Sequence, residues 1–356
     1  MPKTEICIKI PKRQGEKAIA LVNKLKIMDK SLVIQREAEN LCIPLMRQPL
    51  ETELATLKNQ VPETQLATSV FTEKGSPAET LLQHLQGKIP SNLLESLPQA
   101  LDIIGDIVII EIPAELQPYE NSIGQAILKT HKSIKTVLAK AGAISGTYRV
   151  RDFTFIAGEH KTQTVHREFG CPYRVDLAKA YFSPRLSHEH ERVASLVQAG
   201  ETIVDLFAGV GPFSVLIAKM NSKVKVYAVD FNPAAVELLK VNVRVNRVEN
   251  RVFPILGDAK QIAATKLKGK ADRVLMNLPE TAIDFVDAAC QTIKPTGGIV
   301  HFYAFIRLPD SAENLKQRFS KAVEENGRKV ESFLYGKSIR ETAPYESQVA
   351  LDGKIA

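Results

Sequence analysis

The stretch Glu201-Thr-Ile-Val-Asp205-Leu-Phe-Ala-Gly209-Val-Gly211-Pro-Phe213 decides the fold of this chain. The apolar residues before Asp205 predict a buried strand, the two glycines predict a tight turn, and Pro212–Met220 predicts a helix. Glycine has no Cβ, so Gly209 and Gly211 let the backbone approach a ligand closely. The stretch therefore predicts the first strand, turn and helix of an α/β sheet that binds a ligand at this turn.

Downstream of this turn, strands and helices alternate along the sequence. We expect strands at Thr202–Phe207, Lys225–Asp230, Val252–Leu256, Ala271–Asn277 and Gly298–Ala304, helices at Pro212–Met220, Pro233–Val245 and Ala282–Ile293, and a closing hairpin from Lys329–Tyr335 and Gln348–Leu351. This order is typical of a parallel, Rossmann-like doubly wound sheet with helices on both faces. The predicted α/β domain spans residues 178–356.

The turn fits S-adenosylmethionine (AdoMet) better than a dinucleotide. A dinucleotide fold places a third glycine where this chain has Ser214, and Pro212 removes a backbone N–H that a phosphate would need. AdoMet has no phosphate, and Asp205 is placed to meet its cationic amino group. Asp230, after the second strand, is suited to accept hydrogen bonds from ribose hydroxyls, and Asp258, after the third, to meet the adenine edge.

The fourth strand ends in Asn277-Leu-Pro279. Its position in the sheet puts this turn beside the AdoMet sulfonium, where the chemistry is expected. The Asn277 amide offers both a donor and an acceptor, which suits a planar heterocycle with mixed edges. Because Pro279 fixes its own φ and restricts the residue before it, the turn is rigid.

Two smaller units precede the α/β domain. Residues 1–50 predict a small α+β domain with ten Lys/Arg against five Asp/Glu, and the polar residues 51–75 predict a linker. Residues 76–177 predict a middle α+β domain with a buried strand at Ile107–Ile110. In this domain we expect a helix over Ser122–Ala141 and an alternating strand from Gly146. The helix carries a row of basic residues, which are Lys129, Lys132, Lys135 and Lys140.

Composition excludes several classes of protein. The chain has 356 residues, 44% of them hydrophobic, and a formal net charge of +7, which permits a polyanionic partner without requiring one. No apolar run approaches the roughly 20 residues of a membrane span, and the N-terminus lacks the apolar core of a signal peptide. The four cysteines are far apart and form no CxxC motif. We therefore expect a cytoplasmic, reduced protein with no metal site.

Three segments together resemble the archaeal and eukaryotic tRNA (guanine-37, N1)-methyltransferases. They are Asp205–Ser214 (DLFAGVGPFS), Asn277-Leu-Pro279 and Ala180–Leu186 (AYFSPRL). The resemblance covers most of the chain. It implies a class I AdoMet-dependent methyltransferase domain, a monomer, and a tRNA partner bound at its anticodon loop and, through the small N-terminal domain, at its elbow.

The resemblance also implies a role for particular residues. Glu189 would be the general base, Arg149 would stabilise charge on the guanine O6, Asn277 would hold the guanine edge, Pro279 would shape the pocket and Tyr181 would line it. The cofactor would be held by Tyr181, Arg185, Asp205, Phe207, Gly209, Gly211, Phe213, Asp230, Asn232, Asp258 and Asn277. These roles suit the reaction, because the guanine N1 lone pair becomes available only after its proton leaves.

Four alternatives stay open at this point. Glu191 is an alternative base to Glu189, and Arg151 is an alternative to Arg149, since we expect both arginines on one side of a strand. The related wybutosine aminocarboxypropyl transferases share the fold, and a dual enzyme would also methylate 4-demethylwyosine at C7. A tRNA-binding protein without activity and an NAD-type dehydrogenase are disfavoured by the set of Asp205, Asp230, Asn277 and Pro279.

Overall fold

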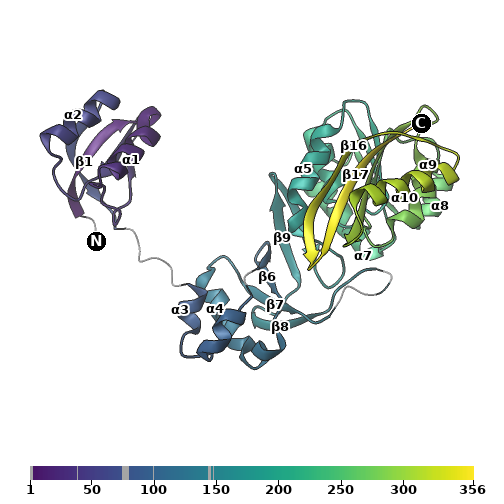
Figure 1. The fold of residues 1–356 in the computed structure, drawn as a ribbon, viewed down its shortest axis with the longest axis horizontal. Coiled ribbons are helices and arrows are strands. Elements are labelled where there is room, and N and C mark those ends of the chain that lie inside the picture. Colours follow the sequence, from purple (N-terminus) through teal and green to yellow (C-terminus); the bar gives the residue numbers. More distant parts are fainter. Residues whose placement is uncertain (1–2, 38, 74–79, 99, 143–145, 147) are drawn as a thin grey trace. The chain divides into compact units, whose positions relative to one another are not determined.

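The computed structural model describes residues 3–37, 39–73, 80–98, 100–142, 146 and 148–356. Contacts divide the chain into two units, Met1–Thr80 and Leu81–Ala356. The second unit contains both the middle domain and the large α/β domain (Figure 1). Among the helices of the described residues, none combines the length and the apolar character needed to cross a bilayer.

The N-terminal unit is a four-stranded antiparallel sheet with two helices. Its elements are β1 (Lys3–Pro11), η1 (Lys12–Gln14), α1 (Gly15–Lys24), β2 (Gln35–Arg36), β3 (Asn40–Pro44), α2 (Glu51–Gln60) and β4 (Gln65–Phe71). The strands lie in the order β2-β3-β1-β4. Ile8 and Ile10 of β1 are buried with Ala18 and Val22 of α1, as their spacing in the sequence predicts.

Residues 51–73 correct the expectation of a linker over 51–75. They contain α2 and β4, and β4 pairs with β1 from Lys3 opposite Phe71 to Lys9 opposite Gln65. The polar sequence conceals this structure because each element contributes one fully buried side chain, Leu57 from α2 and Phe71 from β4. The expected end of the linker, residues 74–75, lies outside the described residues.

The middle domain is a four-stranded mixed sheet covered by helices. Its elements are α3 (Leu81–Leu85), η2 (Ser91–Ser96), β5 (Asp102–Ile104), β6 (Ile107–Ile110), η3 (Ala114–Tyr119), α4 (Glu120–Thr130), β7 (Thr136–Lys140) and β8 (Phe153–Gly158). The strands lie in the order β5-β6-β7-β8, and β6 and β7 are parallel. The predicted buried strand at Ile107–Ile110 is β6, and all four of its residues are buried.

Two expectations in the middle domain are wrong. The predicted helix over Ser122–Ala141 stops at Thr130, and the β-branched Thr136 and Val137 begin β7, which pairs with β6 and β8. Lys132, Lys135 and Lys140 therefore do not share a helical face with Lys129. The predicted strand from Gly146 begins only at Phe153, because Arg149 has a φ of 54° and cannot continue a strand.

The large domain is built on a seven-stranded sheet. Its strands are β11 (Thr202–Asp205), β12 (Lys225–Asp230), β13 (Val252–Leu256), β14 (Arg273–Met276), β15 (Gly298–Arg307), β16 (Val330–Ala343) and β17 (Glu346–Ile355). They lie in the order β13-β12-β11-β14-β15-β17-β16, and β11 to β15 are parallel. β17 runs antiparallel between β15 and β16. This is the doubly wound sheet that the sequence predicts, closed by an antiparallel hairpin.

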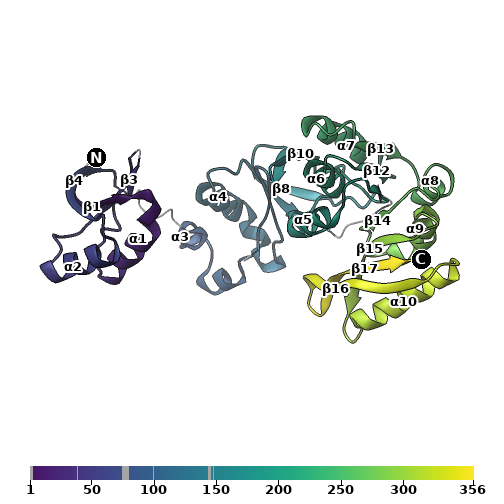
Figure 2. The same cartoon turned by 90° about the horizontal axis from the view of Figure 1, so that it is seen from above.

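Helices cover both faces of this sheet (Figure 2). One face carries η4 (Pro184–Leu186), α5 (Ser187–Leu196), α6 (Pro212–Met220) and α7 (Pro233–Val245); the other carries α8 (Ala259–Thr265), η5 (Ala282–Phe285), α9 (Val286–Thr292) and α10 (Ala312–Glu325). Neighbouring residues of one strand, such as Ile203 and Val204, belong to the two different cores. Two-sided burial explains why the sequence of each parallel strand is almost continuously apolar.

A two-stranded hairpin joins the middle domain to the large domain. It consists of β9 (Gln163–Glu168) and β10 (Cys171–Asp176). The Tyr173 hydroxyl donates to the Pro212 carbonyl at 3.2 Å on the side of the large domain. On the other side, the Asp106 backbone N–H donates to Thr164 Oγ1 at 3.1 Å. The hairpin therefore contacts both domains of the second unit.

Candidate active site

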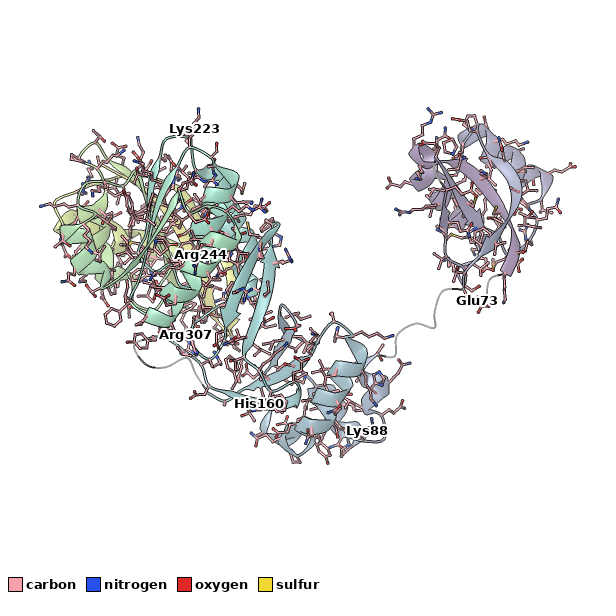
Figure 3. All side chains as sticks on the ribbon, turned by 180° about the vertical axis from the view of Figure 1, so that it is seen from behind. Glu73, Lys88, His160, Lys223, Arg244 and Arg307 are labelled. Atoms are coloured by element: carbon pink, nitrogen blue, oxygen red, sulfur yellow. The ribbon has the colours of Figure 1, made fainter. Side chains whose placement is uncertain are left out.

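A cavity of about 370 Å³ lies at the carboxyl ends of β14 and β15. From β11 the chain builds the sheet first toward β12 and then, from β14, in the opposite direction toward β15. Doubly wound sheets form their ligand crevice at such a change in strand order, which here lies between β11 and β14. In Figure 3, Arg307 marks the edge of the sheet where the parallel strands end, and Lys223, before β12, marks the edge where they begin. The cavity lies at the Arg307 end, and residues of the middle domain complete its wall.

The cavity brings together predicted residues that are far apart in the sequence. Arg149, Tyr181, Arg185, Asn277 and Pro279 all line it. Tyr181 is 40% exposed, so its ring is available to a planar ligand. The middle domain, the segment before α5 and the end of β14 therefore meet at one place, as the predicted catalytic set requires.

Arg149 is held over the end of β14 by an ion pair. Its guanidinium donates to both carboxylate oxygens of Glu280, with Nη2 at 2.8 Å from Oε1. Arg151 also lines the cavity, but its Nη1 donates to the Gly142 carbonyl at 2.8 Å. The two arginines therefore do not lie side by side on a strand, and only Arg149 bonds to the turn that contains Pro279.

A chain of hydrogen bonds orients the Asn277 amide. Gln348, which is buried on β17, donates from Nε2 to Asn277 Oδ1 at 3.4 Å. Arg340 on β16 donates to Gln348 Oε1 at 2.7 Å and to Ser183 Oγ at 3.1 Å. Because the Asn277 oxygen already accepts from Gln348, its NH₂ group is the part left to meet a ligand.

Glu189 is not among the described residues that line the cavity. It is 6% exposed, on α5, and its carboxylate accepts three hydrogen bonds. Arg192 Nε and Nη2 donate to its two oxygens at 2.8 and 2.7 Å, and the Tyr303 hydroxyl donates at 2.7 Å. Glu191 is partly exposed on the same helix. The structure therefore places the predicted base beside the cavity, turned toward the sheet.

Asp205 is buried within the turn after β11. It is 1% exposed and accepts from Ser214 Oγ at 2.8 Å and, more weakly, from the Phe207 N–H at 3.4 Å. Burial raises the pKa of Asp205 to about 7. Through these hydrogen bonds, Asp205 connects the end of β11 to the start of α6.

Asp230 ties the glycine turn to the end of β12. Its Oδ2 accepts from the Gly209 N–H at 2.6 Å and its Oδ1 from the Asn232 N–H at 2.8 Å. Burial raises the pKa of Asp230, although these N–H bonds oppose the shift. Asn232 begins α7, with its side-chain oxygen accepting from Ala234 N at 3.0 Å. Both side chains therefore shape the predicted cofactor turn.

The other predicted cofactor residues divide into two groups. A Cβ on Gly209 would meet no atom nearer than the Tyr181 carbonyl at 3.9 Å, and Asp258 is exposed as the N-cap of α8. Phe207 is partly exposed and packs edge-on against Phe285. By contrast Gly211 packs on Leu239 and Phe213 is 3% exposed in the core. Gly209, Phe207 and Asp258 are therefore accessible to a ligand, whereas Gly211 and Phe213 are parts of the packed core.

Sequence reasoning missed several cavity residues. Gln348 and Arg340 come from the β16–β17 hairpin, which the sequence predicts only as a closing element. Phe305 lies one residue beyond the predicted end of its strand. Glu280 is different, because its position directly after Asn277-Leu-Pro279 was a signal that could have identified it as the partner of Arg149.

Family models match most of the chain. The TRM5/TYW2 methyltransferase domain matches residues 164–331, the TYW2 N-terminal domain matches residues 81–162, and the tRNA methyltransferase 5 N-terminal domain matches residues 7–53. The matched ranges follow the large, middle and N-terminal parts of the fold described above.

Three curated relatives are similar over long ranges. The tRNA (guanine(37)-N(1))-methyltransferase Trm5b of Pyrococcus abyssi is 38% identical over 351 residues, which is 99% of both chains. Its namesake in Methanocaldococcus jannaschii is 32% identical over 98% of both chains. The tRNA 4-demethylwyosine(37)-methyltransferase Taw21 of Saccharolobus solfataricus is 34% identical over 78% of this chain and 99% of its own.

Solved structures agree with these relatives. Trm5b from Pyrococcus abyssi superposes with a TM-score of 0.72 at 36% identity, covering 99% of both chains. The complex of aTrm5 with tRNALeu has a TM-score of 0.68 at 32% identity, covering 98% of this chain and 99% of that one. TYW2 of Methanocaldococcus jannaschii, solved with AdoMet, has a TM-score of 0.56 at 27% identity, covering 72% of this chain and 99% of that one. This chain belongs to the Trm5 family of AdoMet-dependent tRNA (guanine(37)-N1)-methyltransferases.

Proposed function

We propose that this chain transfers the methyl group of AdoMet to N1 of guanosine 37 in tRNA, and that it does so as a monomer. The observation that carries the proposal is the cavity at the sheet reversal, where Arg149, Tyr181, Asn277 and Pro279 meet. Its mixture of a cation, an amide and an aromatic ring matches a guanine, which has an acceptor at O6 and donors at N1 and N2.

Glu189 is the proposed general base. Guanine N1 carries a proton at neutral pH, so a carboxylate must remove that proton before or during attack. The negative charge then moves onto O6, where the Arg149 guanidinium stabilises it, and the surrounding protein makes this interaction stronger than it would be in water. The Asn277 NH₂ group, fixed by Gln348, holds the guanine edge in line with the methyl group.

The proposed cofactor site lies around the glycine turn after β11. Asp230 is placed for the ribose hydroxyls, Asp258 for the adenine edge, and Tyr181 separates this site from the guanine. AdoMet bound there supplies an electrophilic methyl group on a sulfonium, which needs no further activation. The protein therefore contributes position, proton removal and charge stabilisation.

The proposed tRNA contacts lie outside this cavity. Guanosine 37 is next to the anticodon, and it must leave its stack to reach a cavity of this depth, which costs a few kcal/mol. Basic side chains that contact phosphates offset that cost. We propose that residues of the middle domain bind the anticodon loop and that the N-terminal unit binds the elbow through the basic side chains of residues 1–50.

Methyl transfer to transcripts with G37 and with A37 tests the proposal. We expect N1-methylguanosine from the G37 transcript and no product from the A37 transcript.

The Glu189→Gln variant should lose at least a hundredfold in single-turnover rate, because glutamine keeps the shape of the side chain but not its basicity. Glu191→Gln is the matched control on the same helix and should retain the wild-type rate within a few fold. The reverse order of the two variants would reassign the base to Glu191.

A second candidate activity is methylation of 4-demethylwyosine at C7. It is favoured by the 34% identity to the Taw21 protein, which covers 78% of this chain. The position of the label in AdoMet distinguishes methyl transfer from the related aminocarboxypropyl transfer. AdoMet labelled in the methyl group reports methyl transfer, and AdoMet labelled in the carboxyl group reports aminocarboxypropyl transfer. Carboxyl label on tRNA with the tricyclic base, without methylation of G37, would exclude the proposed function.

A further inference from the structure

The proposed base is the end of a row of charged and polar groups that is buried except at the partly exposed Arg192. Arg192 is shared between two carboxylates: it donates to Glu189 from Nε and Nη2, and to Asp352 from Nη1 at 2.7 Å and Nη2 at 3.2 Å. Asp352, which is 2% exposed, also accepts from His301 Nδ1 at 2.7 Å. His301 Nε2 in turn accepts from Arg273 at 3.0 Å. The row crosses from α5 to β17 and β15.

The charge state of this row follows from its contacts. Burial alone would raise the pKa of Asp352, but hydrogen bonds from His301 and Arg192, together with the Arg192 charge, hold that pKa well below its ordinary value. Burial lowers the pKa of His301, whose two nitrogens act as one donor and one acceptor, so the ring is neutral. Burial, together with the Glu189 charge, raises the pKa of Tyr303 far above its ordinary value, so Tyr303 remains a donor.

Further groups face this row from the neighbouring strand and helices. Tyr335 of β16 covers the Arg192 guanidinium, with 4.0 Å between the guanidinium carbon and the ring centre. Lys337 Nζ lies 5.9 Å from the centre of the same Tyr335 ring. Glu201 pairs with Arg273 at the far end, and Phe213 of α6 packs beside Tyr303. Arg192 therefore has Glu189 and Asp352 as its carboxylate partners among the described residues.

Strand register gives the separation between Glu189 and the cavity. His301, Tyr303 and Phe305 alternate along β15, and they pair with Asp352, Ala350 and Gln348 of β17. Phe305 and Gln348 line the cavity, while Tyr303 holds Glu189. Since two residues of a strand span ~7 Å, the Glu189 carboxylate is bound about one strand repeat from the guanine site.

We propose that Arg192, Asp352 and Tyr303 are positioning residues that hold Glu189 withdrawn from the cavity until guanine enters, and then release it. This inference rests on the proposed function. The geometry makes release feasible, because Arg192 keeps its ion pair with Asp352 when Glu189 departs. A partly buried arginine with a single carboxylate partner would be left unpaired when that partner departs. Because Asp352 stays paired with Arg192, Glu189 can leave Arg192 and enter the cavity.

The proton balance of the step is complete. The N1 proton of guanine passes to Glu189, the N1 electron pair forms the bond to the methyl carbon, and the bond between sulfur and that carbon breaks with its electrons left on sulfur. The neutral glutamic acid then loses its proton to water as the product leaves. The regenerated carboxylate returns to Arg192 and Tyr303.

Two substitutions with opposite expected effects test the inference in the full-length enzyme. Tyr303→Phe removes a donor that holds Glu189 back, so the single-turnover rate of methyl transfer should rise, by up to about tenfold. Asp352→Asn removes the second partner of Arg192, so Glu189 is bound more tightly and the rate should fall about tenfold or more. The pH of half-maximal rate should move up in Tyr303→Phe and down in Asp352→Asn, by about one unit each.

Matched controls remove similar groups elsewhere in the same sheet. Tyr227→Phe removes a hydroxyl on β12, and Asp272→Asn removes a carboxylate that pairs with Lys294 before β14. Neither should move the pH profile. AdoMet affinity by calorimetry reports whether each variant is folded, since none of these side chains lies at the glycine turn.

The outcomes separate this inference from the proposed function. Rates that fall in both Tyr303→Phe and Asp352→Asn, or that change in neither, would overturn the inference and leave Glu189 as a base held by purely structural contacts. If the wild-type enzyme forms no N1-methylguanosine, the proposed function itself fails. Opposite changes in rate and in pH profile, with wild-type AdoMet affinity, would support the inference.

Discussion

Arg149 and Arg151 illustrate how one residue can be distinguished from a near neighbour. Both line the cavity, but Arg149 alone is paired with Glu280 at the end of the Asn277-Leu-Pro279 turn. We expect Arg149→Ala to lower the single-turnover rate by 10²- to 10³-fold, in the range found for removal of one donor to a developing oxyanion. Arg151→Ala should cost less than tenfold. A larger loss in Arg151→Ala would assign the O6 contact to Arg151.

Asp205 makes the stability of the large domain depend on pH. Its pKa is raised to about 7 in the folded state, so between about pH 4 and about pH 7 the unfolded chain loses this proton while the folded chain keeps it. The stabilising effect of the protonated form is therefore lost as pH rises through this window.

The Asp205→Asn variant measures this effect. The free energy of unfolding of Asp205→Asn, relative to wild type, should grow by roughly 1 kcal/mol per pH unit between about pH 4 and about pH 7, then stay constant. Urea unfolding at pH 5, 6, 7 and 8 gives the comparison. A difference that does not depend on pH would show that Asp205 is already ionised when folded.

At the scale of one element, the turn between β11 and α6 contains two glycines with different surroundings. Gly211 has a φ of 90°, and a Cβ there would lie 2.3 Å from Leu239 Cδ1. Gly209 has a φ of 55°, with nothing near its Cβ position except the Tyr181 carbonyl at 3.9 Å. We expect Gly211→Ala to destabilise the protein by about 2–4 kcal/mol and Gly209→Ala by only ~1 kcal/mol.

Chemical denaturation and AdoMet titration separate the two effects. Gly209→Ala should remain folded and lose AdoMet affinity, because its Cβ would point into the predicted cofactor site. Gly211→Ala should show a lower unfolding midpoint. Equal stability of the two variants would contradict the different packing of the two glycines.

The strands of the large domain and its helices α6, α7 and α9 were predictable because their local signals agree with the fold, whereas α8 and α10 were not predicted. Pro212 and Pro233 begin helices, and the strand ends at Asp230 and Leu256 were found at the correct residue. In the middle domain the signals conflict. The apolar residues of Ile134–Ala139 fit a helix or a strand equally well, and pairing with β6 and β8 decides for the strand. β4 was missed for a similar reason, since its partner β1 lies about sixty residues away.

At the scale of the whole molecule, the unit boundary lies near residue 80 and not near residue 50. Removal of residues 1–50 would expose Leu57, Val61 and Phe71, which are buried against the strands and helix that this deletion removes. We expect this deletion to aggregate. Removal of residues 1–80 should leave a folded protein with wild-type AdoMet affinity.

Binding of tRNA reports the proposed role of the N-terminal unit. The variant without residues 1–80 should bind full-length tRNA at least tenfold more weakly, and an isolated anticodon stem-loop with unchanged affinity, because only the longer RNA has an elbow. Filter binding at one fixed salt concentration gives both numbers. Unchanged affinity for full-length tRNA would exclude docking by this unit.

Some residues of the candidate site were predictable, but its arrangement was not. Asn277 and Pro279 follow a strand in a known position of the sheet, so their place in the cavity could be predicted. The withdrawn position of Glu189 could not, because it depends on Tyr303 and Asp352, which are more than a hundred residues further along the chain. Pairing of β15 with β17 brings these side chains together, and sequence periodicity contains no information on that pairing.

The position of β17 between two strands that precede it in the chain has a consequence for synthesis of the protein. β17 is the last of the seven strands to leave the ribosome, yet it lies between β15 and β16. Until it arrives, the nascent chain presents the ten-residue edge of β15 without a neighbour, and such an edge invites pairing with another chain. The same strand carries Gln348 and Asp352. A ribosome that stalls before β17 therefore releases a chain that is both prone to aggregate and unable to hold its proposed base.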